Sequence, residues 1–398
     1  MDALERFVSI EQMIRELRPE APVYCLDAAE LRRNVRLFVD HFPGTTLYAV
    51  KCNPHPAVLD VIHAAGIDHF DVASIGEIEK VGQQLPRARL FFMHPVKTLS
   101  SIRSAYRDHA VRDFVVDHPD ELRKIALALG PGAEPAGVRV FVRIRTEPHA
   151  GTSFVLSKKF GAGEDDALQL LKDVAALGFA AAIAFHVGSQ CTTTAPYAEA
   201  LADTLRLAGR SGVDIRAVDV GGGFPAYYRG VAAPPLQEYF EVIGRGLEPL
   251  RREFPQLEVF GEPGRAIVAS AIAVVTQVHL RKGDQLYLND GFYGSLCEAQ
   301  QSGGSIPLNG RTFTASGPRE GAQRLYSLFG PTCDSYDSLG DAVLLDQDTA
   351  MGDWVVFDHQ GAYSNALVTE FNGFQSNHFV AVGEDPAATA RRSAAVNG

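Results

Sequence analysis

Side chains that could do chemistry recur in this sequence directly after short apolar segments. The first segment, 46–50, leads into Lys51, the sixth into His186, and the eighth is followed by Glu262. An amine can bind a carbonyl group covalently, while an imidazole and a carboxylate can accept and donate protons. Further polar residues within or just after these segments are Asp71, Ser74, His94, Arg143, Ser189 and Asp219. This repeated position predicts one shared site if the segments lie side by side.

Two places in the same series are suited to bind phosphate. Gly221, Gly222 and Gly223 follow the seventh apolar segment, and Gly264 and Arg265 follow the eighth. Glycine lets backbone N–H groups approach an anion closely, and arginine can add a bidentate contact. A glycine run alone is more often a plain loop, and a lone lysine after a strand is usually a surface residue. Their joint placement favours a phosphorylated cofactor bound through an amine.

The apolar segments have the composition of buried parallel strands. They are rich in Val, Ile and Phe and mostly lack polar alternation, as strands covered on both faces do. Longer helical segments lie between them, several ending in glycine, a common helix stop. The eight segments are 46–50, 69–74, 89–93, 113–117, 138–144, 180–185, 215–220 and 257–260; examples of the helical ones are 56–66, 119–130, 166–178 and 197–209.

Eight strands with seven or eight helices between about residues 45 and 265 predict an α/β fold, the (β/α)8 TIM barrel. A doubly wound open sheet is the structural alternative, which strand counting alone does not exclude. In a barrel, the polar residues would converge at the carboxyl ends of the strands, where active sites of this fold are built. We call this end the barrel mouth.

The pattern changes after Arg265. Segments 266–283, 284–290, 353–359 and 378–383 read as strands separated by Gly, Asp and Pro, with few helical patterns between them. We therefore expect a barrel over 27–265 and a mainly β domain over 266–398. Residues 1–26, which include the strand-like segment around 21–27, are expected to join the β domain.

Composition narrows the function classes. Net charge is −11 without a basic cluster, which argues against nucleic-acid binding, and no apolar stretch approaches the length of a membrane span. The N-terminus lacks the basic and apolar regions of a secretory signal. Five cysteines without a CxxC motif make a disulfide scaffold or structural zinc unlikely to be the basis of the fold, and we expect no metal. A reducing cytoplasm is the simplest compartment.

Several motifs together resemble the ornithine decarboxylase family of barrel-fold pyridoxal-phosphate (PLP) decarboxylases. Tyr48 to Asn53, YAVKCN, is similar to the family's cofactor-lysine motif. The resemblance extends from about residue 22 to residue 382 and implies PLP on an alanine-racemase-like barrel. The other motifs follow in the family's order: FDVAS, SKKFGA, FHVGSQC, DVGGGFP, EPGR, NDGFYGS, GPTCDSYD, GAYSNA and FNGF.

The resemblance implies roles for individual residues around the cofactor. Lys51 would carry PLP as a Schiff base, Glu262 would face the pyridine nitrogen, and His186 would stack on the ring. Asp71 and Arg143 would lie around the lysine and the ring hydroxyl. The phosphate would be held by Ser189, Gly222, Gly223, Gly264, Arg265 and Tyr363.

The resemblance also implies a homodimer with active sites shared between subunits. Cys333 would come from the partner subunit and protonate the α-carbon after CO2 leaves, with Asp334 binding the distal amine and Tyr363 also near the substrate. The expected reaction is decarboxylation of a basic L-amino acid, ornithine or lysine, to the amine in polyamine biosynthesis. No nucleic acid or membrane partner is expected.

One departure from the ornithine enzymes concerns their second carboxylate for the distal amine. Its position falls near Ser302 in this sequence, and Glu298 is acidic but lies several residues early. Arginine, meso-diaminopimelate, or a modified or carrier-bound amino acid therefore stay open as alternative substrates.

Three rival interpretations differ at specific residues. Diaminopimelate decarboxylases typically have Glu-Ser before the catalytic cysteine, where this chain has Pro331-Thr332. Alanine racemase shares the barrel but needs a tyrosine base where this family offers Cys333. An inactive binding protein of the antizyme-inhibitor type would have lost cofactor residues, all of which are present here.

Overall fold

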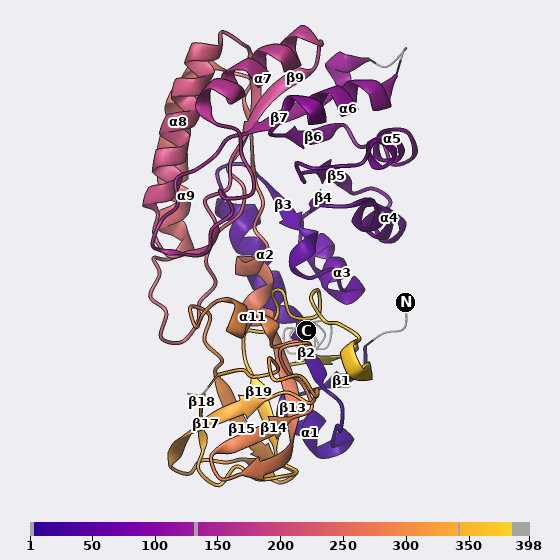
Figure 1. Ribbon diagram of the computed structural model, residues 1–398, viewed down its shortest axis with the longest axis vertical. Helices are drawn as coiled ribbons and strands as arrows, with labels where there is room; N and C mark the ends of the chain where they lie inside the picture. Colours follow the sequence, from indigo (N-terminus) through magenta and orange to yellow (C-terminus); the bar gives the residue numbers. More distant parts are fainter. Residues whose placement is uncertain (1–3, 131–133, 341–342, 384–398) are drawn as a thin grey trace, which may run out of the picture. The chain divides into compact units, whose positions relative to one another are not determined.

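The computed structural model describes residues 4–130, 134–340 and 343–383, which form two compact units (Figure 1). The barrel unit comprises 35–225 and 232–266. The β unit comprises the chain up to Asn34, 226–231, and the chain from Ile267 on. The two units are described separately below.

Eight parallel strands close into a barrel in the order β11-β12-β3-β4-β5-β6-β7-β9. All eight apolar segments expected to be strands form these strands, so the predicted TIM barrel is confirmed and the open sheet was the wrong alternative. Large apolar side chains such as Phe91, Phe141 and Phe260 fill the interior. The strands are β3 (Thr45–Ala49), β4 (His69–Val72), β5 (Arg89–Phe92), β6 (Asp113–Val116), β7 (Arg139–Arg143), β9 (Ala180–Ala184), β11 (Ile215–Asp219) and β12 (Glu258–Gly261).

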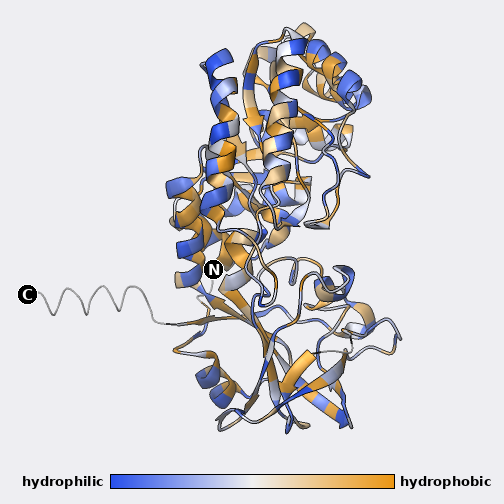
Figure 2. Ribbon diagram, turned by 90° about the vertical axis from the view of Figure 1, so that its left-hand side faces the viewer, coloured by the Kyte–Doolittle hydropathy of each residue, from blue (hydrophilic) through white to orange (hydrophobic). Residues whose placement is uncertain are grey.

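Amphipathic helices connect the barrel strands. In α9 the buried residues Tyr239, Phe240, Ile243, Leu247 and Leu250 recur at helical spacing, so one face packs inward. The mixture of hydrophilic and hydrophobic residues along such helices is visible in Figure 2. The helices are α2 (Ala28–His41), α3 (Pro56–Ala64), α4 (Ile75–Gln84), α5 (Leu99–Asp108), α6 (Pro119–Leu129), α7 (Glu164–Ala176), α8 (Ala195–Ser211) and α9 (Leu236–Glu253), with short 3-10 helices η1 (Val50–Cys52) and η2 (Pro135–Gly137). Strands β8 (Thr152–Phe154) and β10 (Ser189–Cys191) pair with each other.

The β unit is built on a ten-stranded sheet with the path β1-β20-β2-β13-β14-β17-β18, and β15, β16 and β19 branch from it. Segment 266–271, part of an expected strand, is instead helical, within α10 and η3. Strands β15, β17 and β18 were not expected from the sequence. The elements are β1 (Arg6–Phe7), α1 (Ile10–Leu17), β2 (Val23–Asp27), α10 (Arg265–Val268), η3 (Ala269–Ala271), β13 (Ile272–Lys282), β14 (Gln285–Leu288), α11 (Cys297–Gln301), β15 (Gly310–Thr314), β16 (Gly317–Pro318), β17 (Gln323–Phe329), β18 (Val343–Asp346), β19 (Trp354–Phe357), η4 (Phe371–Gly373) and β20 (His378–Val382).

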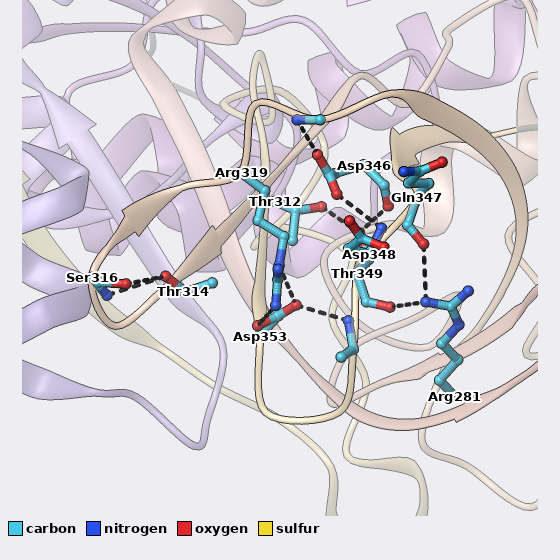
Figure 3. Close-up of polar contacts among 12 residues, drawn as sticks. Arg281, Thr312, Thr314, Ser316, Arg319, Asp346, Gln347, Asp348, Thr349 and Asp353 are labelled. Carbon is cyan, nitrogen blue, oxygen red and sulfur yellow. Dashed lines mark hydrogen bonds and ion pairs between the residues drawn. The ribbon is translucent and has the colours of Figure 1, made fainter.

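Polar side chains fix the turns of this sheet (Figure 3). Arg319 donates to both oxygens of Asp353, at 2.8 and 3.1 Å, and Asp353 also accepts from the N–H of Ala350 at 2.8 Å. Arg281 donates to the backbone oxygen of Thr349 at 2.6 Å. These contacts satisfy backbone groups that would otherwise be unpaired in the turns. Among the described helices, none is long and apolar enough to cross a membrane.

Candidate active site

Lys51 and Asp71 meet at the barrel mouth. Lys51 lies in η1, directly after β3, and Asp71 lies on the neighbouring strand β4. The Lys51 ammonium forms an ion pair with Asp71 Oδ2. The Asp71 side chain is buried, whereas that of Lys51 is 39% exposed. A buried carboxylate therefore orients an amine that remains accessible at the end of the strands.

His186 follows β9 and is held by backbone contacts. Its Nδ1 accepts a hydrogen bond from the N–H of Gly188 at 3.0 Å, and its carbonyl oxygen accepts from Thr146 Oγ1 at 3.0 Å. Burial, with the cations Arg143 and Lys51 nearby, lowers the pKa of His186 well below its usual range. The imidazole is therefore neutral at pH 7, which suits a ring that packs against a flat ligand.

Two carboxyl groups, Glu262 and Asp219, lie close together at the carboxyl ends of β12 and β11. Burial, reinforced by Asp219 and Asp71, raises the pKa of Glu262 well above its usual range. Burial also raises the pKa of Asp219 to about 6, although its Oδ1 accepts from the N–H of Gly221 at 2.8 Å. Lys51 and Arg143 only partly offset this effect on Glu262, so ionising the pair is costly, and the site favours a ligand with a positively charged N–H group.

The glycine loop after β11 is packed against its neighbours. A Cβ on Gly222 would lie 2.6 Å from the Glu262 carbonyl oxygen and 3.0 Å from His186 Nε2. Gly223 has φ +103°, and a Cβ there would lie 2.4 Å from the Gly188 oxygen. Only glycine fits both positions. The Tyr197 hydroxyl on α8 donates to the Gly222 oxygen at 2.9 Å and fixes the loop from behind.

Arg265 and Ser189 lie beside this loop. Arg265 is buried, and its guanidinium donates to Ser189 Oγ at 3.3 Å. The segments after three neighbouring strands, β9, β11 and β12, thus bring a guanidinium, a hydroxyl and close-packed glycines together. Gly264 belongs to the same turn, where a Cβ would lie 2.8 Å from Cys52 Cβ.

These groups fit a PLP molecule. An accessible lysine amine lies at one strand end, and a buried carboxyl pair that favours an N–H cation lies at others. Buried oxygens Asp71 Oδ1 and Asp219 Oδ2 receive no hydrogen bond from the described residues. The glycine loop and Arg265 supply the donor set that a phosphate needs. Arg143, over the ring of Phe160 at 5.2 Å, adds a cation at the mouth.

The β unit holds a second group of predicted residues. Cys333 is exposed, and its backbone N–H and Sγ both donate to Asn372 Oδ1, at 3.2 and 3.3 Å. Asp334 Oδ2 accepts from the Tyr293 hydroxyl at 2.5 Å, and Oδ1 accepts from the Tyr336 N–H at 3.0 Å. The Tyr293 hydrogen bond, followed by the backbone one, lowers the pKa of Asp334. Asp334 is therefore an oriented, ionised carboxylate suited to bind an ammonium group.

Tyr363 and Ser302 also belong to the β unit. Tyr363 has a left-handed backbone, φ 53°, and its oxygen accepts from Cys297 Sγ at 3.8 Å. Ser302 follows α11, and its hydroxyl donates to the Ala299 oxygen at 2.9 Å. The side chain at this position closes a helical turn and supplies no carboxylate.

Sequence reasoning gave no role to four residues that organise these groups: Asp219, Tyr197, Tyr293 and Asn372. Asp219, Tyr293 and Asn372 belong to the motifs DVGGGFP, NDGFYGS and FNGF, so the motifs carried a signal for them. Tyr197 carried none, because a tyrosine inside an amphipathic helix reads as ordinary packing.

Known proteins are similar over most of the chain. The family model described as pyridoxal-dependent decarboxylase, pyridoxal binding domain, matches residues 28–269. Lysine/ornithine decarboxylase from Selenomonas ruminantium is 33% identical over 84% of both chains. Diaminopimelate decarboxylase from Vibrio cholerae is 32% identical over 82% of this chain and 80% of that one. Lysine/ornithine decarboxylase from Vibrio vulnificus, crystallised with cadaverine, gives a TM-score of 0.79 at 30% identity, covering 95% of this chain and 100% of that chain. The chain therefore belongs to the pyridoxal-dependent decarboxylases, with pyridoxal phosphate as its cofactor.

Proposed function

We propose that this decarboxylase acts on L-ornithine or L-lysine and releases putrescine or cadaverine with CO2. The observation that carries the proposal is Asp334, an ionised carboxylate held by Tyr293 and by the Tyr336 backbone. Such a group binds the distal ammonium of a basic amino acid through a charge-assisted hydrogen bond. The similarity to lysine/ornithine decarboxylases at 33% and 30% identity supports the same substrate class.

The residues of the candidate site would hold the cofactor, most of them from the barrel unit and Tyr363 from the β unit. Lys51 would be the amine that binds it covalently, Glu262 would face its ring nitrogen, and His186 would pack as a neutral ring on its face. Asp71 orients Lys51 through the ion pair. The phosphate would be held by Ser189, Gly222, Gly223, Gly264, Arg265 and Tyr363. Bound pyridoxal phosphate supplies an electron sink for the negative charge left at the α-carbon when CO2 departs.

Cys333 would then return a proton to the α-carbon. The S–H bond breaks as the new C–H bond forms, and the sulfur keeps the electron pair. Cys333 is the exposed thiol of the chain, since Cys25, Cys52, Cys191 and Cys297 are all buried. Its exposure makes it available to a second protein surface.

That second surface would be the barrel mouth of another copy of this chain. A thiol that must deliver one proton to one particular atom has to be shielded from water. In the single chain, however, Cys333 and its surroundings are exposed. Exposed apolar side chains in the same part of the β unit are Tyr336, Leu367, Phe371 and Phe374, and they suit burial against a partner. We therefore assign the chain to a closed homodimer in which each site takes Cys333 and Asp334 from the partner.

The pathway and the compartment belong to the same proposal. Diamine products are the starting compounds of polyamine biosynthesis. The five cysteines are all free thiols, which suits a reducing cytoplasm.

A CO2-release assay tests the substrate. Purified enzyme is supplied with L-ornithine, L-lysine, L-arginine, meso-diaminopimelate and the D-isomers of ornithine and lysine. We expect the highest kcat/KM with L-ornithine or L-lysine, and Asp334→Asn should raise KM for that substrate at least ten-fold. Asp348→Asn, an exposed carboxylate of the same unit, is the matched control. Preference for meso-diaminopimelate, or an unchanged KM in Asp334→Asn, would contradict the proposal.

A further inference from the structure

The Cys333 thiol has a defined partner within its own unit. Asn372 Oδ1 accepts both from the Cys333 backbone N–H at 3.2 Å and from Sγ at 3.3 Å. A cysteine side chain otherwise rotates among three staggered positions, and an exposed one has little packing to select among them. One amide oxygen that binds both the backbone and the sulfur selects a single position.

The backbone of Asn372 fits this arrangement. Asn372 has φ 53° and ψ 13°, within η4. This left-handed conformation is disfavoured for most side chains, but asparagine tolerates it well. An asparagine can therefore adopt the left-handed backbone and also present a side-chain acceptor. Glycine can adopt the same backbone but has no side-chain acceptor.

The segment that carries Asn372 is tied to the residues that orient Asp334. The Phe371 ring lies 4.7 Å from the Tyr293 ring, centroid to centroid. The Tyr293 backbone oxygen accepts from the N–H and from Oγ1 of Thr369, at 2.9 and 3.1 Å. Tyr293 in turn donates to Asp334. The thiol and the carboxylate are thus held through one connected group of contacts.

We propose that Asn372 is a positioning residue that fixes the side-chain rotamer of Cys333 and so the position of its sulfur. This inference rests on the proposed function, in which Cys333 gives its proton to the α-carbon. The amide oxygen accepts the S–H until transfer and holds the sulfur at one distance and angle. Without it, the thiol samples several rotamers, and a proton from another source can reach a different atom.

Three variants separate this role from a purely structural one. Asn372→Gly keeps the left-handed backbone and removes the acceptor, while Asn372→Asp keeps both. Asn377→Gly removes an exposed asparagine further along the same segment and serves as the control. PLP content and circular dichroism show that each holoenzyme is folded.

The first readout is alkylation of Cys333 by iodoacetamide, measured by mass spectrometry on the holoenzyme. The other four cysteines are buried within the chain, whereas Cys333 in the proposed dimer faces the site that small-molecule substrates must enter, so the label reports on Cys333. We expect alkylation about three- to ten-fold faster in Asn372→Gly, the factor that loss of one neutral hydrogen bond gives. Asn372→Asp and Asn377→Gly should react no more than two-fold faster than wild type. An unchanged rate in Asn372→Gly overturns the proposal.

The second readout is the fraction of turnovers that yield the amine instead of a carbonyl product. This fraction should fall in Asn372→Gly, with a smaller change in CO2 release, and Asn372→Asp should restore it. The same product fraction is measured for Cys333→Ala. If Cys333→Ala yields clean amine, the proposed role of Cys333 is wrong and Asn372 has no proton to direct. If only Cys333→Ala misplaces the proton, the role of Cys333 stands and that of Asn372 fails.

Discussion

Lys51 is distinguished by what its amine contacts. Another lysine, Lys97, is buried and donates to the carbonyl oxygens of His94, Pro95 and Val115 at 2.9, 3.1 and 2.6 Å, so its three protons are used within the protein. Burial lowers the pKa of Lys97 to about 8. Lys51 instead pairs with Asp71 and remains 39% exposed. Accessibility and orientation, more than charge, mark Lys51 as the residue for covalent binding.

Lys51→Ala should therefore abolish the visible absorbance of covalently bound PLP and nearly all turnover. The physical reason is that no equivalent amine replaces it, since Lys97 is occupied. Lys172→Ala, an exposed residue on α7, is the control. Absorbance spectra and CO2 release are measured together. A coloured, active Lys51→Ala protein would show that another amine binds the cofactor.

Arg265→Ala should weaken PLP binding more than it slows chemistry at saturating cofactor. Arg265 is buried beside Ser189 and, in the proposed site, would contribute a charged hydrogen bond to the phosphate, about 1.5–3 kcal/mol or roughly ten- to 150-fold in Kd. PLP titration of the apoprotein measures Kd, and kcat at saturating PLP measures chemistry. Arg245→Ala on α9 is the exposed control. The prediction fails if Kd matches that of the control.

The residues of the candidate site were largely predictable, because each follows a strand whose position the apolar pattern defines. Lys51, His186 and Glu262 were found in this way. The motif FNGF marked the segment of Asn372, but the role of this residue could not be predicted, because it depends on a left-handed turn and on Cys333, 39 positions earlier in the chain. Contacts between distant loops leave no periodic pattern in the sequence.

At the scale of elements, the barrel strands were predictable for a physical reason that the β unit lacks. Barrel strands are covered on both faces and read as continuous apolar segments. β17 and β18 expose Leu325 and Leu344, which are 53% and 55% accessible and face each other in the sheet. Because apolar residues lie on the exposed face as well as on the buried face, these strands show no alternation of apolar and polar residues. Segment 266–271, short and alanine-rich, has a composition that suits a helix as well as a strand.

The loop after β14 contains a buried acid that should make stability depend on pH. Asp290 accepts from the N–H groups of Gly291 and Ser295 at 2.8 and 3.0 Å, yet burial raises its pKa from 3.8 to about 6. The folded protein therefore binds this proton more readily than the unfolded chain. The stabilisation is complete below about pH 4 and is lost as pH rises through 6.

As pH falls from 7.5 to 5, the unfolding free energy of wild type should thus rise by about 1 kcal/mol relative to that of Asp290→Asn. Asparagine keeps an acceptor oxygen and removes the titration. The unfolding free energy is measured by urea denaturation, monitored through the fluorescence of Trp354. This single tryptophan is buried in the β unit. Asp348→Asn, exposed in the same unit, should show no such pH-dependent difference. A constant difference between wild type and Asp290→Asn at both pH values would contradict the assignment.

At the scale of the whole molecule, the proposed chemistry is divided between two compact units. The barrel unit supplies the groups for the cofactor, and the β unit supplies an exposed thiol and an oriented carboxylate. The sequence indicates this division through a change in pattern after Arg265. It does not determine which copy of the chain completes which site, because association depends on surfaces and not on periodicity.

A complementation experiment tests the shared site directly. Lys51→Ala and Cys333→Ala enzymes, each inactive in amine formation, are mixed under conditions of subunit exchange. In a heterodimer with shared sites, one site contains both lesions and the other contains neither. With random exchange, half of the dimers are heterodimers, so about a quarter of the sites regain wild-type composition, a counting estimate for closed two-fold symmetry. Amine production should rise to roughly that fraction. Differently tagged subunits verify exchange. In the control, Lys51→Ala is mixed with Arg265→Ala, whose lesions both lie in the barrel unit. Activity should then be about half that of Arg265→Ala at the same total concentration, because half of the barrels carry each lesion. If exchange is verified and no amine activity returns, Cys333 serves its own subunit or has no part in the reaction.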